Sequence, residues 1–205
     1  KDQVLSAKVL RLANSPFYGF PSRIASVAPA VVVLGLNVVT GLTLCATAFD
    51  MMRNAGMNEL WRHSLGVAMT AHILGTKAAM KNPEEVFVAG LLHDIGKVVL
   101  YVKWPDVGQQ ITTVTRNTSR PLMDAEQELF EVTHADVGGW LASAWHLPTS
   151  LREPILHHHT PAAAQDAKLQ TAIVHVADVL VKGLACGNPG DNLVPPLSRQ
   201  AWDLV

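Results

Sequence analysis

The spacing of apolar residues is the feature that most restricts how this chain can fold. Apolar side chains recur at intervals of three and four residues, as in Val4, Leu5, Val9 and Leu12, and this period places them on one face of an α-helix. The alternation of apolar and polar residues that a half-buried strand needs is missing from the sequence. We therefore predict an all-α fold.

The size and composition of the chain indicate a folded protein with a substantial core. Of its 205 residues, 49% are hydrophobic and 16% are charged, which excludes a disordered tail or a solvating linker. The length suits one large domain or two closely packed units. The segment RNAGMNEL is the clearest internal boundary. We assign residues 1–54 to an N-terminal helical unit and residues 55–205 to a helical core, together forming one continuous domain.

Helix start and stop signals divide the chain into elements. In the first unit we expect helices over residues 4–12, 26–34 and 37–52, with Gly35 as a break and an aromatic loop over 14–23 that packs inward. In the core we expect a bend at Gly96 and a loop over 187–196. The expected core helices span residues 59–80, a segment beginning at Pro83, and residues 124–132, 134–145, 149–158 and 168–184.

Charge and cysteine content restrict the partners and the compartment. Sixteen basic and 17 acidic residues leave a net charge of −1, which provides no field for a phosphate backbone or an anionic lipid surface. The most apolar stretch, residues 25–36, is shorter than the roughly 20 residues of a membrane span, and the start of the chain lacks the pattern of a cleaved leader. Cys45 and Cys186 are too few for a disulfide framework or a thiolate zinc site. We expect a cytoplasmic protein that binds neither nucleic acid nor membrane.

Several residues have the chemistry of metal ligands. Glu59 and His63 stand four apart, on one face of a predicted helix. His93 and Asp94 form an adjacent pair, and we expect both to reach a shared cavity. A second adjacent pair, His157 and His158, and the carboxylate of Asp178 follow.

Imidazole and carboxylate ligands without thiolates suit one or two divalent ions such as Fe, Mn, Ni or Mg rather than structural zinc. Asp94 is the natural bridge between two ions, a geometry that would turn a bridging water into a nucleophile. For His72, His146 and His159 we expect ordinary packed or surface roles. His175 lies three residues before Asp178, so it either orients that carboxylate or belongs to the core.

The order of these candidate ligands along the chain resembles that in the HD superfamily of metal-dependent phosphohydrolases. The most typical sequence motifs of the superfamily here are HDIGK and VHVAD. The opening block LSAKVLRLANSPFYGFPSRIASVAPAVVVLGLNVVTGLTL is similar to the start of the HDOD domain, the HD-related output domain of bacterial signalling proteins. WRHSLGVA, GLLHDIGKVV, HADVGGWLASAWHLP and IVHVADVL are similar to that family's later blocks. The resemblance covers nearly the whole chain.

This resemblance implies a small N-terminal helical unit packed on an HD-like helical core, in a signalling module that acts through contacts with a signalling protein or a small phosphorylated ligand. The related HD-GYP phosphodiesterases cleave cyclic di-GMP. By motif, their metal ligands correspond here to Glu59, His63, His93, Asp94, His134, His157, His158 and Asp178, and Lys97 to a lysine that meets the substrate phosphate. The Gly-Tyr-Pro signature is not present after His158, where the sequence reads HTPAAAQDAK.

Three functions are compatible with these features. The leading hypothesis is a non-enzymatic HDOD output module whose core binds one or two divalent ions and which acts by binding a ligand or a protein. The alternative is a metal-dependent phosphohydrolase acting on a nucleotide or cyclic dinucleotide, with Asp94 and Lys97 as catalytic residues. The third is a purely structural interaction domain with an empty core. The sequence leaves the oligomeric state open.

Overall fold

The computed structural model describes residues 6–7, 10–11, 13–14, 24–118, 120–191 and 193–205. Every regular element among these residues is a helix, so the predicted all-α fold is confirmed. Most of the helix expected over residues 4–12, and most of the aromatic loop expected over 14–23, lie outside the described residues.

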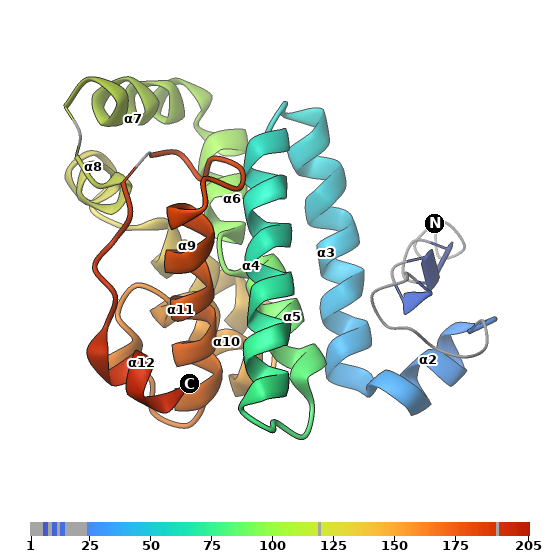
Figure 1. Ribbon diagram of the computed structural model, residues 1–205. Helices are drawn as coiled ribbons and strands as arrows, with labels where there is room; N and C mark the ends of the chain where they lie inside the picture. The colour runs from blue at the N-terminus through green and yellow to red at the C-terminus, as the bar shows by residue number, and fades with distance from the viewer. Residues whose placement is uncertain (1–5, 8–9, 12, 15–23, 119, 192) are drawn as a thin grey trace.

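Most helices follow one another through short connections, whereas the longer segment 184–198 joins α11 to α12 (Figure 1). The longest, α4, has 20 residues, and no described helix combines the length and the apolar character that a bilayer span requires. Their bounds are α2 Val27–Leu34, α3 Leu36–Asn54, α4 Asn58–Lys77, α5 Pro83–Leu92, α6 Ile95–Lys103, α7 Pro105–Thr118, α8 Leu122–Phe130, α9 His134–Ala144, α10 Thr149–His157, the 3₁₀ helix η1 Pro161–Ala163, α11 Lys168–Gly183 and α12 Arg199–Leu204.

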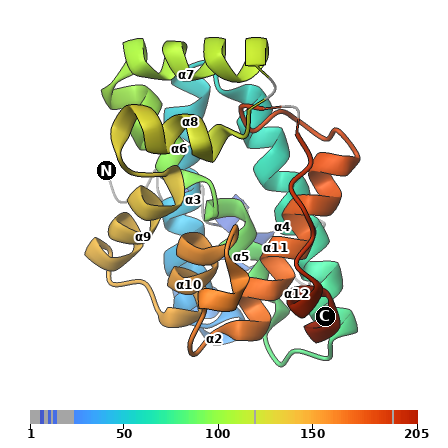
Figure 2. The same cartoon turned by 90° about the vertical axis from the view of Figure 1, so that its left-hand side faces the viewer.

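The helices pack in a bundle around α5. Helix α4 packs against α5 and α11, α10 packs against both α5 and α9, and α6 packs against α9. Helices α7 and α8 lie at one end of the bundle, whereas α12 and the C-terminus lie toward the other (Figures 1 and 2). This arrangement brings the second turn of α4, the start of α6, the start of α9, the end of α10 and part of α11 toward one interior point.

The main apolar core is continuous from α3 to α11. Leu42 of α3, Val67 of α4, Leu92 of α5 and Leu151 of α10 are all fully buried in it. A smaller cluster, made by Ala13, Ile24, Ala30 and Val39, joins α2 to α3. Helix α3 therefore contributes to both clusters, and the segment assigned to residues 1–54 shares its core with the rest of the chain.

Two local features differ from the sequence-based expectation. Helix α7 was not predicted, because Pro105, Gly108 and several threonines lower its helix propensity. Its residue Ile111 is nevertheless buried against Leu122 of α8, and such packing outweighs propensity. The chain bends between α5 and α6, at His93 and Asp94, so the bend expected at Gly96 is wrong: Gly96 lies inside α6.

A carboxylate fixes the start of α11. The buried Glu153 of α10 accepts hydrogen bonds from the backbone N–H groups of Gln165, Asp166 and Ala167, the last at 2.7 Å. Burial opposes ionisation of Glu153, but these three donors outweigh it and hold its pKa below the ordinary value of 4.5. The charged carboxylate therefore ties α10 to α11.

We expect Glu153→Gln to lower the free energy of unfolding by about 1–3 kcal/mol at pH 7, because hydrogen bonds to a charged acceptor are lost. A group with a depressed folded pKa stabilises the protein above its unfolded pKa, and this contribution disappears as the pH falls through the folded pKa. Urea unfolding at pH 7 and below pH 4 checks this result. A difference between variant and wild type that does not shrink on acidification would contradict it.

Candidate metal centre

The bend between α5 and α6 places His93 and Asp94 at the interior point where the helices converge. A close approach of α6 to α9 supports this position: a Cβ atom on Gly96 would lie 1.9 Å from the carbonyl oxygen of His134. Only a residue without a side chain lets the two backbones come this close. The same approach brings His134, the first residue of α9, beside Asp94.

One group of ligand atoms comes from α4, the bend and α11. Nε2 of His63 lies 3.0 Å from Oδ1 of Asp178, and Nε2 of His93 lies 3.9 Å from the same oxygen. Oδ2 of Asp94 lies 3.3 Å from Nε2 of His93 and 4.0 Å from Nε2 of His63. These four side chains are fully or almost fully buried.

A second group comes from α9 and the end of α10. The other oxygen of Asp94, Oδ1, lies 3.2 Å from Nε2 of His134 and 3.7 Å from Nε2 of His158. Nε2 of His159 lies 3.0 Å from Nε2 of His134. One ligand atom from each of these three histidines lies within 4.8 Å of the other two. Asp94 thus offers one oxygen to each group, which is the position of a bridging carboxylate.

The hydrogen bonds of three histidines determine which ring nitrogen faces the centre. Nδ1 of His93 donates to the carbonyl of Gly90 at 2.7 Å, and Nδ1 of His158 donates to the carbonyl of Ile155 at 2.9 Å. Nδ1 of His134 lies 2.6 Å from the carboxylate of Glu126. Since each Nδ1 has an acceptor for its proton, the neutral ring directs the Nε2 lone pair inward, as metal-binding histidines do.

The centre also contains buried polar atoms without a hydrogen-bond partner of acceptable geometry. Leaving such atoms unsatisfied costs free energy, and a divalent cation coordinated by them would remove that cost. These residues therefore fit a metal ion, and the buried His and Asp groups could bind one. The unsatisfied atoms that face the centre are Nε2 of His63, His93 and His158, and Oδ1 of Asp94 and Asp178.

The balance of charges at the centre also favours a divalent metal ion. Burial opposes ionisation of Asp94, but His93 and Lys97 outweigh it and hold the Asp94 pKa well below its usual range. Burial likewise opposes the charge on Lys97, yet Asp94 and then Glu126 keep its pKa raised. Metal ligation requires neutral imidazoles. In that state the carboxylates of Asp94, Glu126 and Asp178 exceed the one lysine charge by two, and one divalent ion would balance this excess.

Lys97 occupies an unexpected place. Its Nζ lies 2.7 Å from Oδ2 of Asp94, and the side chain is 2% exposed. The lysine therefore supports the Asp94 carboxylate from inside the core.

Two predicted ligands are not brought to the centre. Glu59 shares a helix face with His63, but it lies in the first turn of α4, where its carboxylate is exposed and pairs with Arg62 at 3.1 Å. His157 is the last residue of α10 and is half-buried, and no described metal-binding group includes it. Helix α10 ends at His157, and it is the following His158 and His159 that face the centre.

Two residues of the centre were missed by sequence reasoning. His159 was expected to have an ordinary role, although its place in a run of three histidines was a usable signal. Glu126 carries no local signal, because it lies on α8, a separate helix, and reaches His134 only through the fold. His175 does not orient Asp178: its Nδ1 donates to the carbonyl of His158 at 2.7 Å, and its Nε2 accepts from the backbone N–H of Ser198 at 2.9 Å. Of the two roles expected for His175, the structure therefore supports the one in the core.

The fold and the centre together define the class of protein: an all-helical domain whose interior holds a His–Asp cluster suited to divalent metal. Comparison with known proteins identifies the family. The HDOD domain family model matches residues 1–161, and the chain belongs to this family. Within the centre, Asp178 lies beyond the matched segment.

Three similar proteins include one HDOD domain protein. The crystal structure of an HDOD domain protein of unknown function from Geobacter sulfurreducens is 31% identical, with a TM-score of 0.75, over 99% of this chain and 72% of that one. A candidate phosphohydrolase from Shewanella amazonensis has the same fold, with 23% identity and a TM-score of 0.67 over 99% of this chain and 78% of that one. An uncharacterized protein of Treponema pallidum is 25% identical over 94% of this chain. The chain spans 38% of the length of that relative.

We expect Glu126→Gln to weaken divalent metal binding by about 10- to 100-fold, the usual effect of removing a carboxylate that orients a ligand histidine. The amide is nearly isosteric but lacks the charge that holds Nδ1–H of His134. Competition with a fluorescent chelator measures the affinity. The matched control is Glu128→Gln on the same helix, where an exposed carboxylate pairs with Arg120; equal losses in both variants would contradict the prediction.

Proposed function

We propose that this chain is an HDOD signal-transduction output module whose HD-type core binds one or two divalent ions and which acts by binding a ligand or a signalling partner. The enclosure of the centre is the observation that carries the proposal. His63, His93, Asp94, His134, His158 and Asp178 are each no more than 2% exposed. Hydrolysis needs a phosphorus atom beside the metal, and such tight burial favours a structural or sensing role instead.

The position of Lys97 supports the same conclusion. In a phosphohydrolase this lysine would offset charge on the phosphoryl oxygens. Here its ammonium group is buried and already paired with Asp94. An incoming phosphate would have to break this pair and displace packed side chains.

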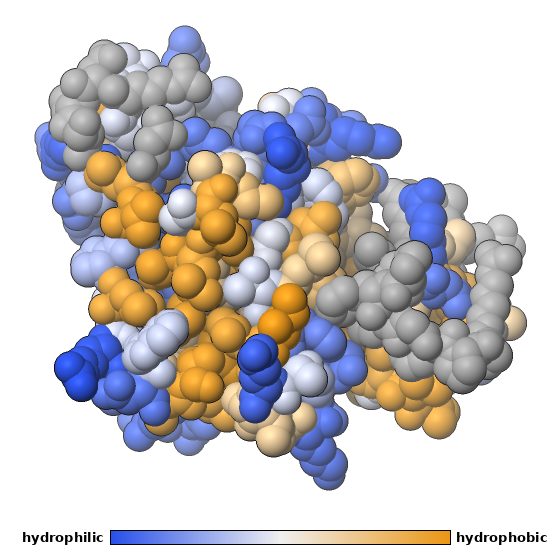
Figure 3. Space-filling model, viewed as in Figure 1, coloured by the Kyte–Doolittle hydropathy of each residue, from blue (hydrophilic) through white to orange (hydrophobic). Residues whose placement is uncertain are grey.

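An exposed apolar surface supports binding to a partner. On α4, Leu65, Met69 and Ile73 are spaced four residues apart, and their exposed fractions are 37%, 46% and 54%. Leu180 and Leu184, on and just after the neighbouring α11, are also exposed. Figure 3 shows apolar side chains gathered over this face. Clustered apolar exposure of this kind is typical of interaction sites.

The second candidate, a metal-dependent phosphohydrolase acting on a nucleotide or cyclic dinucleotide, is favoured by one specific observation. The two oxygens of Asp94 face two separate ligand groups, as in centres that hold two ions and activate a bridging water. In that case Asp94 would hold the pair of ions, and the half-buried His159 would lie nearest to solvent.

Metal analysis and hydrolysis assays together test the proposal. For protein purified without a polyhistidine tag, we expect one or two divalent ions per chain by mass spectrometry. We also expect no turnover of cyclic di-GMP or nucleoside phosphates near the ordinary enzymatic rate of about 1 s⁻¹ or faster. Turnover at that rate that is lost in His93→Ala would establish the phosphohydrolase instead. Protein that stays metal-free after incubation with Mn²⁺, Fe²⁺, Ni²⁺ and Mg²⁺ would favour an empty structural core.

A further inference from the structure

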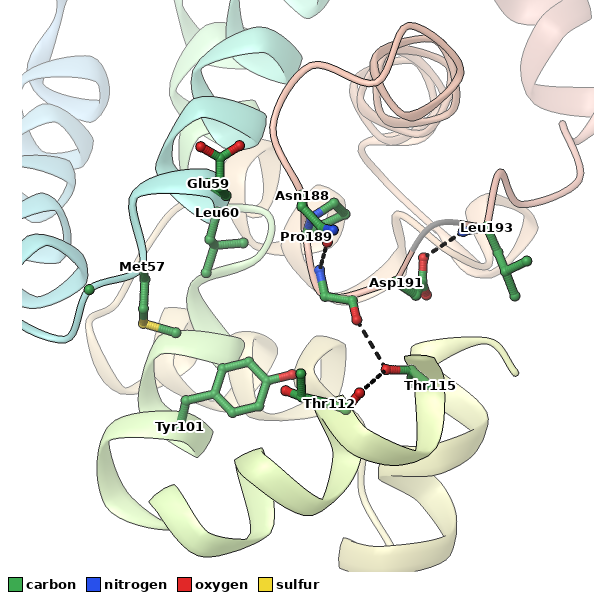
Figure 4. Close-up of a pocket in the computed structure, with 12 residues that line it drawn as sticks. Met57, Glu59, Leu60, Tyr101, Thr112, Thr115, Asn188, Pro189, Asp191 and Leu193 are labelled. Carbon is green, nitrogen blue, oxygen red and sulfur yellow. Dashed lines mark hydrogen bonds between the residues drawn. The ribbon is translucent and has the colours of Figure 1, made fainter. Parts of the chain in front are cut away.

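A pocket outside the metal centre lies where the segment after α11 crosses the start of α4 and the α6–α7 pair (Figure 4). Its volume of about 350 Å³ is at the lower end of the roughly 300–1,000 Å³ typical of small-molecule sites. None of the buried histidines or aspartates of the centre lines it. The described lining residues are Gly56, Met57, Glu59, Leu60, Tyr101, Thr112, Thr115, Asn188, Pro189, Gly190, Asp191 and Leu193.

The hydroxyl of Tyr101 is the distinctive polar group of this pocket. It is buried and has no hydrogen-bond partner, although buried tyrosine hydroxyls usually find one. Figure 4 shows the Tyr101 ring extending from α6 toward Thr112 of α7, with its oxygen at the inner end. Burial, and then the carboxylates of Glu126 and Asp94, raise the Tyr101 pKa above its ordinary value. The hydroxyl therefore keeps its proton and can donate a hydrogen bond.

The remaining walls combine apolar surfaces with further hydrogen-bonding groups. Met57, Leu60 and Pro189 contribute apolar surface to the walls of the pocket. The hydroxyl of Thr112 donates to the carbonyl of Gly108, which leaves its oxygen lone pairs able to accept. Such a surface suits a flat ring that carries both donors and acceptors.

The charges at the pocket are already balanced. The carboxylate of Glu59 pairs with Arg62 at 3.1 Å. That of Asp191 pairs with Lys182 at 3.1 Å and accepts a hydrogen bond from the backbone N–H of Leu122 at 2.9 Å. Among the described lining residues there is no lysine, arginine or histidine. An anionic ligand would thus find no opposite charge there, and an uncharged ligand fits better.

We propose that this pocket binds an uncharged, ring-containing compound of nucleobase or nucleoside size, whose polar atom pairs with the Tyr101 hydroxyl. The inference deepens the proposed function, because it assigns a site and a ligand class to its ligand-binding role. The pocket is also adjacent to the metal centre along the chain. Glu59 and Leu60 line it in the first turn of α4, and His63 follows in the next turn.

The segment after α11 that closes the pocket packs directly against the first two turns of α4. The backbone N–H of Asn188 donates to the carbonyl of Glu59 at 3.2 Å. A Cβ atom on Gly187, which has a φ of +75°, would lie 2.4 Å from the backbone nitrogen of His63. A bound compound would therefore contact a segment that is packed against the helix carrying a metal ligand.

Calorimetric titration with adenosine and guanosine tests the proposal, with adenosine and guanosine monophosphates as the anionic counterparts. We expect at least one nucleoside to bind wild-type protein more tightly than its monophosphate does. Tyr101→Phe should weaken that binding by about two- to tenfold, the range for one hydrogen bond. Without ligand it should melt at the same or a higher temperature, because an unsatisfied hydroxyl is removed.

Two further variants complete the experiment. Thr112→Leu places a larger apolar side chain in the pocket and should also weaken binding. Thr113→Val removes an exposed hydroxyl from the same helix, outside the pocket, and should bind as wild type does. The proposal is overturned if neither nucleoside binds at millimolar concentration, if the monophosphates bind more tightly, or if Tyr101→Phe binds equally well. Metal content measured on the same samples shows separately whether the metal-binding core fails.

Discussion

Gly96→Ala should lower the free energy of unfolding by about 3 kcal/mol or more, at or above the upper end of the usual cost of overpacking. The added methyl group would lie 1.9 Å from the carbonyl oxygen of His134 and 2.9 Å from the backbone nitrogen of Gly138. Both obstacles are backbone atoms, so a side-chain rotation cannot relieve the clash, and α6 must separate from α9. Urea denaturation followed by circular dichroism measures the change.

The matched control is Gly183→Ala. Gly183 is the last residue of α11, and a Cβ atom there meets nothing within 4 Å. Since alanine favours a helix over glycine by roughly 0.5–1 kcal/mol, this variant should be as stable as the wild type or slightly more stable. Equal stability of the Gly96 and Gly183 variants would show that α6 and α9 do not depend on the close approach.

Asp94→Asn should reduce divalent metal affinity by more than the roughly 10- to 100-fold expected for a supporting residue, because it alters an oxygen donor to both ligand groups. It should also destabilise the metal-free protein by about 3–5 kcal/mol, since Lys97 is left as a buried charge without its partner. Metal content per chain and denaturation in the presence of a chelator measure the two effects. Full metal content in this variant would contradict the bridging role of Asp94.

A double variant separates the two effects of Asp94→Asn. Lys97→Met removes the unpaired ammonium and keeps most of the side-chain volume, so Asp94→Asn combined with Lys97→Met should recover stability. It should not recover metal binding, because the amide that replaces the Asp94 carboxylate in the double variant still lacks the second oxygen donor and the negative charge. Recovery of metal binding in the double variant would mean that Lys97, rather than the loss of a ligand, causes the defect.

Local sequence signals predicted most of the helices, because apolar period and end signals act within a few residues. Helix α9 begins at His134 as expected, where Thr133 and Asp136 form a capping box. Helix α7 was missed because its stability comes from the packing of the buried Ile111 and the partly buried Val107 against α8, which propensity does not reflect. The bend at His93 and Asp94 was misplaced for a related reason: Gly96 is required by contact with α9, not by a turn.

For the candidate site, residue types were easier to predict than positions. The order of His and Asp residues predicted His63, His93, Asp94, His134, His158 and Asp178, and the structure brings all six together. The choice among His157, His158 and His159 depended on the residue at which α10 ends. The exclusion of Glu59 depended on its place at the solvent end of α4.

By itself the sequence determined that the chain is helical, that it has the motifs of the HDOD family and that its candidate metal ligands are imidazoles and carboxylates, since these properties reside in residue types and short spacings. Only the tertiary structure decided that Glu126 supports His134, that Lys97 is enclosed with Asp94 and that Tyr101 faces a separate pocket. Those relations join helices far apart along the chain. They arise from how the helices pack, which no local pattern specifies.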